Sequence, residues 1–118
     1  MYKEEDFKRM HPKWLAKLAE LTEEDRDLDL TIERYYCTSS LWDDELDRFP
    51  DMAKHYTGSL DAKIKGENII RVIMGQPDPA MPAQWVAWHL KPDGMLSQGR
   101  ARTEACARRL AFINSLPV

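Results

Sequence analysis

Residues 84–91 read QWVAWHLK and residues 67–74 read ENIIRVIM. Both stretches are rich in β-branched and aromatic residues, and such runs predict extended strands rather than helices. The segment between them contains three prolines, which indicates a loop. Successive side chains of a strand point to opposite faces, and both faces of 84–91 are largely apolar. We therefore expect a sheet that is covered on both sides.

The chain after these strands predicts one more strand and a final helix. Pro92-Asp93-Gly94 is a turn signal that leads to a short third strand over residues 95–101. Thr103 is placed to cap a last helix whose apolar stripe extends to Ile113. Ahead of the first strand, Ser59 predicts a short helix over 60–64.

The first part of the chain predicts helices. Apolar residues recur at helical spacing over residues 4–21, although Pro12 favours a stronger element that begins at that proline. Residues 22–25 supply a capping signal for a second helix that continues to about Cys37. The predicted fold class is α+β, with a small antiparallel sheet of about three strands packed in layers with an N-terminal helical region and a C-terminal helix.

The chain length predicts one domain with three parts. The 118 residues fit a single domain. Residues 1–37 form the helical region, 38–57 a long acidic loop, and 58–118 a core of a helix, three strands and a helix. We find no internal repeat.

Charge is distributed unevenly along the chain. The net charge is −3, from 20 acidic and 17 basic side chains. Residues 1–61 hold 16 acidic against 9 basic side chains, whereas 62–118 hold 4 against 8. Such asymmetry bears on partners and association rates rather than on the fold. It favours a basic partner for the first half.

Several classes of protein are not expected. The acidic start lacks a secretory signal, and no apolar run approaches the length of a membrane span. Cys37 and Cys106 provide no disulfide framework, which fits a reducing cytoplasm. We find no phosphate-binding glycine loop and no catalytic motif, so we expect no enzyme activity, no cofactor and no membrane partner. Direct nucleic-acid binding is not expected at this net charge.

The candidate contact residues are acids of the first half together with one aromatic anchor. Carboxylates steer association with a basic surface, and an interleaved tryptophan supplies a desolvated anchor. The predicted partner-binding residues are Glu23, Glu24, Asp25, Asp27, Asp29, Trp42, Asp43, Asp44, Glu45 and Asp47.

Two alternatives stay open. A small metal-dependent enzyme would use the three histidines, which are isolated in sequence, with the carboxylates of residues 43–47. The segment 43–47 lacks the glycine of a calcium loop of the EF-hand type, and a solvated acidic face explains it more simply. A nucleic-acid-associated regulator would instead use a set of arginines near the C-terminus, namely Arg100, Arg102, Arg108 and Arg109.

The second half resembles a family of small phage proteins. Residues 56–62 read YTGSLDA, Trp85 and Ala87 lie in a strand, and residues 102–111 read RTEACARRLA. Over about residues 56–115, this pattern resembles the phage ABA-sandwich family of uncharacterised tailed-phage and prophage proteins. The resemblance implies a layering of helix, sheet and helix and a phage or prophage origin, but no activity. The shared motifs are structural, and the acidic first half departs from the pattern.

Together, these observations predict a non-catalytic phage or prophage protein that binds a host protein. The expected partner has a basic surface, and a nucleic-acid-binding defence component is the most specific candidate. A counter-defence inhibitor such as an anti-CRISPR protein fits the small size and the acidic first half.

Overall fold

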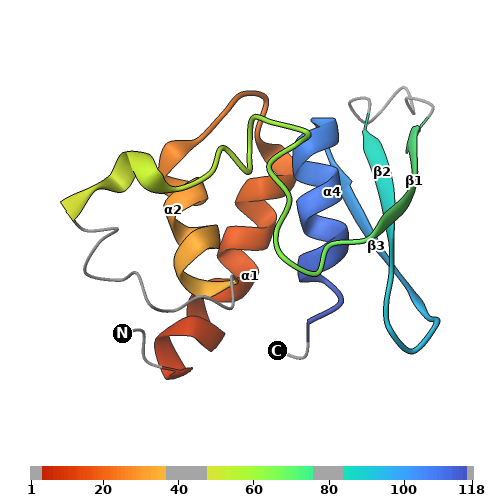
Figure 1. Ribbon diagram of the computed structural model, residues 1–118, viewed down its shortest axis with the longest axis horizontal. Coiled ribbons are helices and arrows are strands. Elements are labelled where there is room, and N and C mark those ends of the chain that lie inside the picture. Colours follow the sequence, from red (N-terminus) through yellow and green to blue (C-terminus); the bar gives the residue numbers. More distant parts are fainter. Residues whose placement is uncertain (1–3, 37–47, 76–83, 117–118) are drawn as a thin grey trace.

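The described residues form three α-helices, one 3-10 turn and a three-stranded antiparallel sheet, which confirms the predicted α+β class. The computed structural model describes residues 4–36, 48–75 and 84–116. The elements are α1 (Glu4–Glu20), α2 (Arg26–Tyr35), the 3-10 turn η2 (Pro50–Met52), β1 (Ile69–Met74), β2 (Trp85–Leu90), β3 (Leu96–Ala101) and α4 (Glu104–Ile113). Helix α4 lies between the sheet and the α1–α2 pair (Figure 1).

The close packing of α4 on β3 depends on small residues. The strands are ordered β1-β2-β3, and Ala87 of β2 pairs with Gly99 of β3. A Cβ atom at Gly99 would lie only 2.2 Å from the backbone nitrogen of Ala111 and 2.3 Å from the carbonyl oxygen of Ala107. The helix backbone therefore touches the strand directly, and Ala107 and Ala111 are fully buried. The predicted strands and final helix are present at nearly the expected positions.

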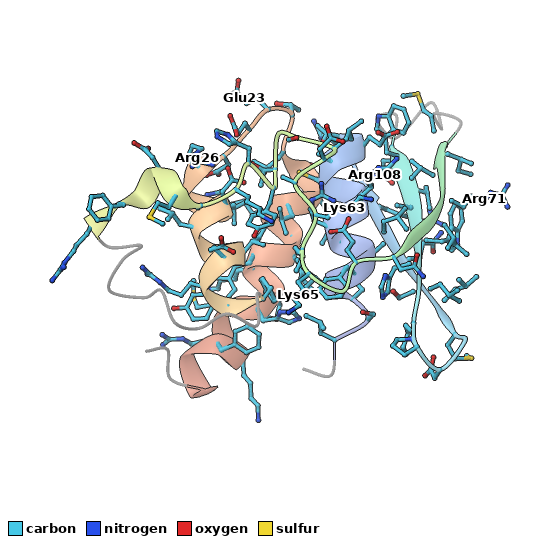
Figure 2. All side chains as sticks on the ribbon, viewed as in Figure 1. Glu23, Arg26, Lys63, Lys65, Arg71 and Arg108 are labelled. Carbon is cyan, nitrogen blue, oxygen red and sulfur yellow. The ribbon has the colours of Figure 1, made fainter. Side chains whose placement is uncertain are left out.

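The opposite face of the sheet is not covered by any described element, so the expectation of a sheet covered on both sides is corrected. All the described helices lie on one side of the sheet (Figure 1). On the other side, Ile73 is 39% exposed and Leu96 53% exposed. The guanidinium carbon of Arg71 lies 5.3 Å from the ring centroid of Trp88, and Arg71 extends to the edge of the molecule (Figure 2).

Helix α1 is continuous through Pro12, so the expectation of a stronger element beginning at that proline is wrong. Proline removes a single backbone donor from a helix, and packing can offset that cost. Phe7 lies before the proline and stacks on Tyr35 of α2 with ring centroids 5.9 Å apart. Trp14 lies after the proline and stacks on the same ring at 4.7 Å. Aromatic contacts on both sides of Pro12 thus hold α1 against α2.

The segment 53–68 contains turns where a short helix over 60–64 was predicted, and that prediction is wrong. Arg109 of α4 explains the difference, because its guanidinium donates hydrogen bonds to the carbonyl oxygens of Tyr56, Ser59 and Leu60 at 2.7–3.2 Å. A helix would direct these carbonyl groups to its own backbone. Arg109 is fully buried and also pairs with Glu67.

Candidate functional site

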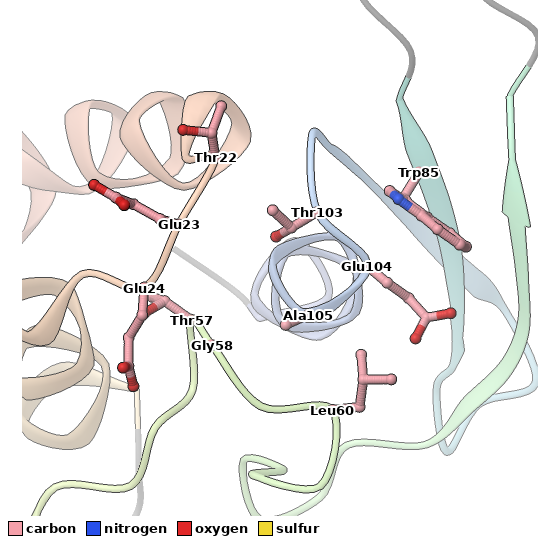
Figure 3. A pocket seen from close by; sticks show the side chains of 10 residues that line it. All are labelled: Thr22, Glu23, Glu24, Thr57, Gly58, Leu60, Trp85, Thr103, Glu104 and Ala105. Atoms are coloured by element: carbon pink, nitrogen blue, oxygen red, sulfur yellow. The ribbon is translucent and has the colours of Figure 1, made fainter.

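A cleft of about 480 Å³ opens where the α1–α2 connection, the 53–60 segment and the start of α4 meet. One side is acidic and the other is partly apolar (Figure 3). The lining residues are Thr22, Glu23, Glu24, Thr57, Gly58, Leu60, Trp85, Thr103, Glu104 and Ala105.

Asp25 fixes the acidic side of the cleft. Its side chain caps α2 by accepting the backbone N–H of Leu28 at 3.1 Å, and its own N–H donates to Oγ1 of Thr57 at 2.9 Å. These bonds hold the connection between α1 and α2 in place. Glu23 and Glu24 are consequently presented to solvent.

Asp25 also has a perturbed pKa. Burial alone would raise the pKa of this carboxyl group. The hydrogen bond from Leu28 and the charge of Lys17, whose Nζ lies 3.2 Å from an Asp25 oxygen, outweigh burial and lower the pKa below its ordinary value. The carboxylate form that caps the helix is therefore favoured.

Thr103 and Glu104 shape the other side of the cleft. Oγ1 of Thr103 accepts the backbone N–H of Cys106 at 3.2 Å and caps α4. Glu104 follows in the first turn and extends toward the side on which Trp85 and Leu60 lie (Figure 3). A carboxylate in this turn offsets the partial positive charge of the helix end. Leu60 is 46% exposed, so an apolar surface is available beside this carboxylate.

The cleft suits a cation with an apolar or planar part. Three glutamates line it: Glu23 is exposed, Glu24 contacts His55, and Glu104 lies 3.6 Å from Arg108 and near the indole of Trp85 and the side chain of Leu60. Carboxylates attract Arg and Lys, and a guanidinium also stacks on an indole face. The hydroxyl oxygen of Thr57 accepts the backbone N–H of Asp25, and that of Thr103 accepts the backbone N–H of Cys106 at the start of α4.

The structure separates the predicted acidic residues into different roles. Glu23 and Glu24 line the cleft, and Asp27 is exposed on α2. Asp25 acts as a helix cap. The remaining candidates lie outside the described residues: Trp42, Asp43, Asp44, Glu45 and Asp47.

The prediction that Asp29 contacts a partner is wrong, because its side chain is fully buried. Oδ1 accepts the backbone N–H of Thr57 at 2.8 Å, and Oδ2 accepts from Arg26 at 2.8 Å. Arg26 donates in turn to the carbonyl oxygen of Ala53 at 2.8 Å. Asp29 therefore joins α2 to the 53–60 segment.

The four arginines considered for nucleic-acid binding do not form one exposed basic surface. Arg109 is fully buried, so its expected contact with a nucleic acid is wrong. Arg102 pairs with Glu20 at 3.0 Å, and Arg108 lies 3.6 Å from Glu104. Charges paired in this way are less available to phosphate groups.

The histidines do not converge on one site. Nδ1 of His11 lies 2.7 Å from the hydroxyl of Tyr36, whereas His89 accepts the backbone N–H of Asn68 at 2.9 Å. Burial lowers the pKa of both imidazoles. His55 lies elsewhere and contacts Glu24. Burial also raises the pKa of the Cys106 thiol, which disfavours its reactive thiolate form.

Sequence reasoning missed Leu60, Trp85 and Glu104 as parts of the cleft. Thr103 signalled the start of α4, so the helical position of Glu104 could be inferred from the sequence. Its proximity to the α1–α2 connection could not, because the two segments are far apart in the chain.

Comparisons with protein-family models, curated proteins and solved structures found no match. The resemblance to the phage family therefore stays a prediction. None of the helices in the described part of the chain has the length and apolarity needed to span a bilayer.

Proposed function

We propose that this protein is a binding module whose acidic cleft accepts an arginine side chain of a basic partner protein. The observation that carries the proposal is the lining of the cleft, where Glu23, Glu24 and Glu104 occur with Trp85 and Leu60. Arginine matches this lining best, because its planar guanidinium forms paired hydrogen bonds with carboxylates and stacks on aromatic rings.

The charge of the surrounding surface supports a basic partner. Asp27 is exposed on α2, next to the connection that carries two of the cleft glutamates. Opposite charges across an interface increase association rates and favour one orientation, an effect that salt screens. A partner that normally holds nucleic acid offers many exposed arginines. The narrower proposal is therefore a phage or prophage counter-defence inhibitor, active in the bacterial cytoplasm, that occupies such a surface.

A peptide-binding experiment tests the cleft directly. Binding of a nine-residue arginine peptide, measured by calorimetry at low salt, is compared between the unchanged protein and the double variant Glu23→Gln with Glu104→Gln. We expect the double variant to bind about tenfold more weakly, since two carboxylates of the cleft are neutralised. A nine-residue lysine peptide should bind more weakly than the arginine peptide, because ammonium groups cannot form the paired bonds.

The control distinguishes the cleft from general attraction to a negative protein. Asp61 and Asp51 of η2 are exposed and lie outside the cleft, so Asp61→Asn with Asp51→Asn removes the same charge elsewhere. Asp27 stays unchanged in this control, because it belongs to the proposed binding surface. This control should keep most of the affinity. Equal loss in the control and the cleft variant would contradict the proposal. Capture from a bacterial lysate with both variants would then identify partners that depend on the cleft.

A further inference from the structure

Three side chains with metal-ligand chemistry meet beside the cleft. Glu24, Asp29 and His55 each offer one ligand atom, and these atoms all lie within 4.8 Å of one another. Nδ1 of His55 already contacts Oε1 of Glu24. Ligand atoms of a tetrahedral zinc site are about 3.3 Å apart, since each bond is about 2.0–2.2 Å long. Small rotations of the two exposed side chains would produce this spacing.

Asp29 is held in position by groups around the cluster. The backbone N–H of Thr57 and the guanidinium of Arg26 each bind one of its carboxylate oxygens at 2.8 Å. Each carboxylate oxygen has two lone pairs, so these bonds leave acceptor capacity for a cation. Hydrogen bonds of this kind orient the ligands of metal sites in proteins.

Gly58 brings Glu24 and His55 together. A Cβ atom at Gly58 would lie 2.9 Å from Cβ of Glu24, so glycine permits the close approach. The carbonyl oxygen of His55 accepts the N–H groups of Gly58 and Ser59 at 3.2 and 2.9 Å. The turn that carries His55 is thereby fixed against the connection that carries Glu24.

The cluster is accessible from solvent and carries two carboxylates. The side chain of His55 is 58% exposed and that of Glu24 is 37% exposed, so a cation can enter from solvent and keep bound water. Of the two carboxylates, that of Asp29 pairs with the guanidinium of Arg26 at 2.8 Å. A divalent cation would bring a compensating positive charge to the carboxylates and would take the place of the direct contact between His55 and Glu24.

We propose that Glu24, Asp29 and His55 bind a divalent transition-metal ion of the Zn²⁺ type. An imidazole with two carboxylates suits Zn²⁺, whereas Mg²⁺ and Ca²⁺ favour sites made of oxygen ligands. The three ligands come from the α1–α2 connection, α2 and the 53–60 segment. The ion therefore links these segments. It also binds Glu24, so the negative charge that this residue contributes to the cleft depends on whether the metal is bound.

Thermal unfolding with added metal tests the site. The purified, chelator-treated protein is heated with Zn²⁺ alone, with Mg²⁺ alone and with neither. We expect Zn²⁺ at about 100 times its Kd to raise Tm by about 5 °C or more, because it binds only the folded state. Mg²⁺ should leave Tm nearly unchanged. Calorimetry should give one Zn²⁺ per chain.

Exposed ligands allow the test without unfolding the protein. His55→Gln and Glu24→Gln should fold and should lose most of the Tm increase. Glu23→Gln, which changes the neighbouring glutamate outside the cluster, should keep it. No increase with Zn²⁺, or an equal increase in His55→Gln, would overturn the proposal and leave only the contact between Glu24 and His55.

The proposals of a metal site and of an arginine-binding cleft can be contradicted independently. His55→Gln removes a metal ligand but does not change a residue that lines the cleft, so it should still bind the arginine peptide in the absence of metal. Glu23→Gln with Glu104→Gln should weaken peptide binding while it retains the response to Zn²⁺.

Discussion

Helix α4 meets β3 through backbone contact, whereas α2 meets the 53–60 segment through a buried carboxylate. In the first region, Ala107 and Ala111 close onto Gly99, which leaves no room for a side chain. In the second, Asp29 receives the N–H of Thr57 and the guanidinium of Arg26. The first contact depends on the shape of small residues. The second depends on hydrogen bonds made away from water.

These two contacts tolerate change differently. A substitution that adds volume to close apolar packing destabilises the protein through steric overlap. A substitution that removes one partner of a buried hydrogen bond destabilises it because the other partner stays buried and unsatisfied. The acidic half therefore contains carboxylates with two kinds of role. Asp29 stabilises the fold, and Glu23 and Glu24 remain exposed at the cleft.

The largest effect is expected from Gly99→Val. The new Cβ would overlap backbone atoms of α4 at 2.2–2.8 Å, so the helix must move away from the sheet. We expect a loss of about 4 kcal/mol in the free energy of unfolding, measured with urea. Gly94→Ala is the control, because nothing lies within 4 Å of its Cβ position and only its φ of +87° causes strain. That control should lose about 1 kcal/mol. Equal losses would contradict direct backbone contact.

Asp29→Ala should have the next largest effect. It leaves the N–H of Thr57 without its acceptor and removes the carboxylate partner of Arg26, and we expect a loss of about 3 kcal/mol. Asp27→Ala, two residues earlier on the exposed side of α2, should change stability little. Urea unfolding of both variants measures the difference. Similar small losses would show that the buried hydrogen bonds do not distinguish the two aspartates.

Acidification should destabilise the fold through two histidines. Burial lowers the pKa of His89, in β2, and of His11, in α1, below the ordinary value of 6.5. Each therefore contributes stability that is present above about pH 6.5 and is lost as the pH falls, since protonation favours the unfolded chain. We expect the free energy of unfolding to fall between pH 7.5 and 5.5. The double variant His11→Gln with His89→Gln should show a weaker dependence, and an unchanged dependence would refute this assignment.

The smallest effects are expected at the two helix caps. Asp25→Ala and Thr103→Ala should each lose about 1 kcal/mol at pH 7, because each removes the acceptor for a helix N–H group. The pKa of Asp25 is lowered, so its contribution is present above about pH 4 and disappears as the pH falls through the lowered pKa. The contribution of Thr103 should not depend on pH in this range. Unfolding at pH 7 and pH 3 compares them, and a pH-dependent Thr103 contribution would contradict this prediction.

Local patterns predicted most of the regular elements. The β-branched runs located β1 and β2, and the Thr103 signal located α4, since strand preference and capping depend on residues close in sequence. The short helix expected over 60–64 failed because Arg109, far along the chain, takes the carbonyl groups of that segment. The expectation of a stronger element beginning at Pro12 was wrong because aromatic packing on α2 holds both sides of the proline.

The sequence by itself determined the helices, the strands and the excess of acid in the first half. Only the tertiary structure decided which acids are available to a ligand. Asp27 and Asp29 are two residues apart in one helix, yet the first is exposed and the second is fully buried. Burial depends on what packs against each side chain, and here Thr57 and Arg26 cover Asp29. For the same reason, only the folded chain brings Glu104 and Trp85 to the cleft and His55 to Glu24.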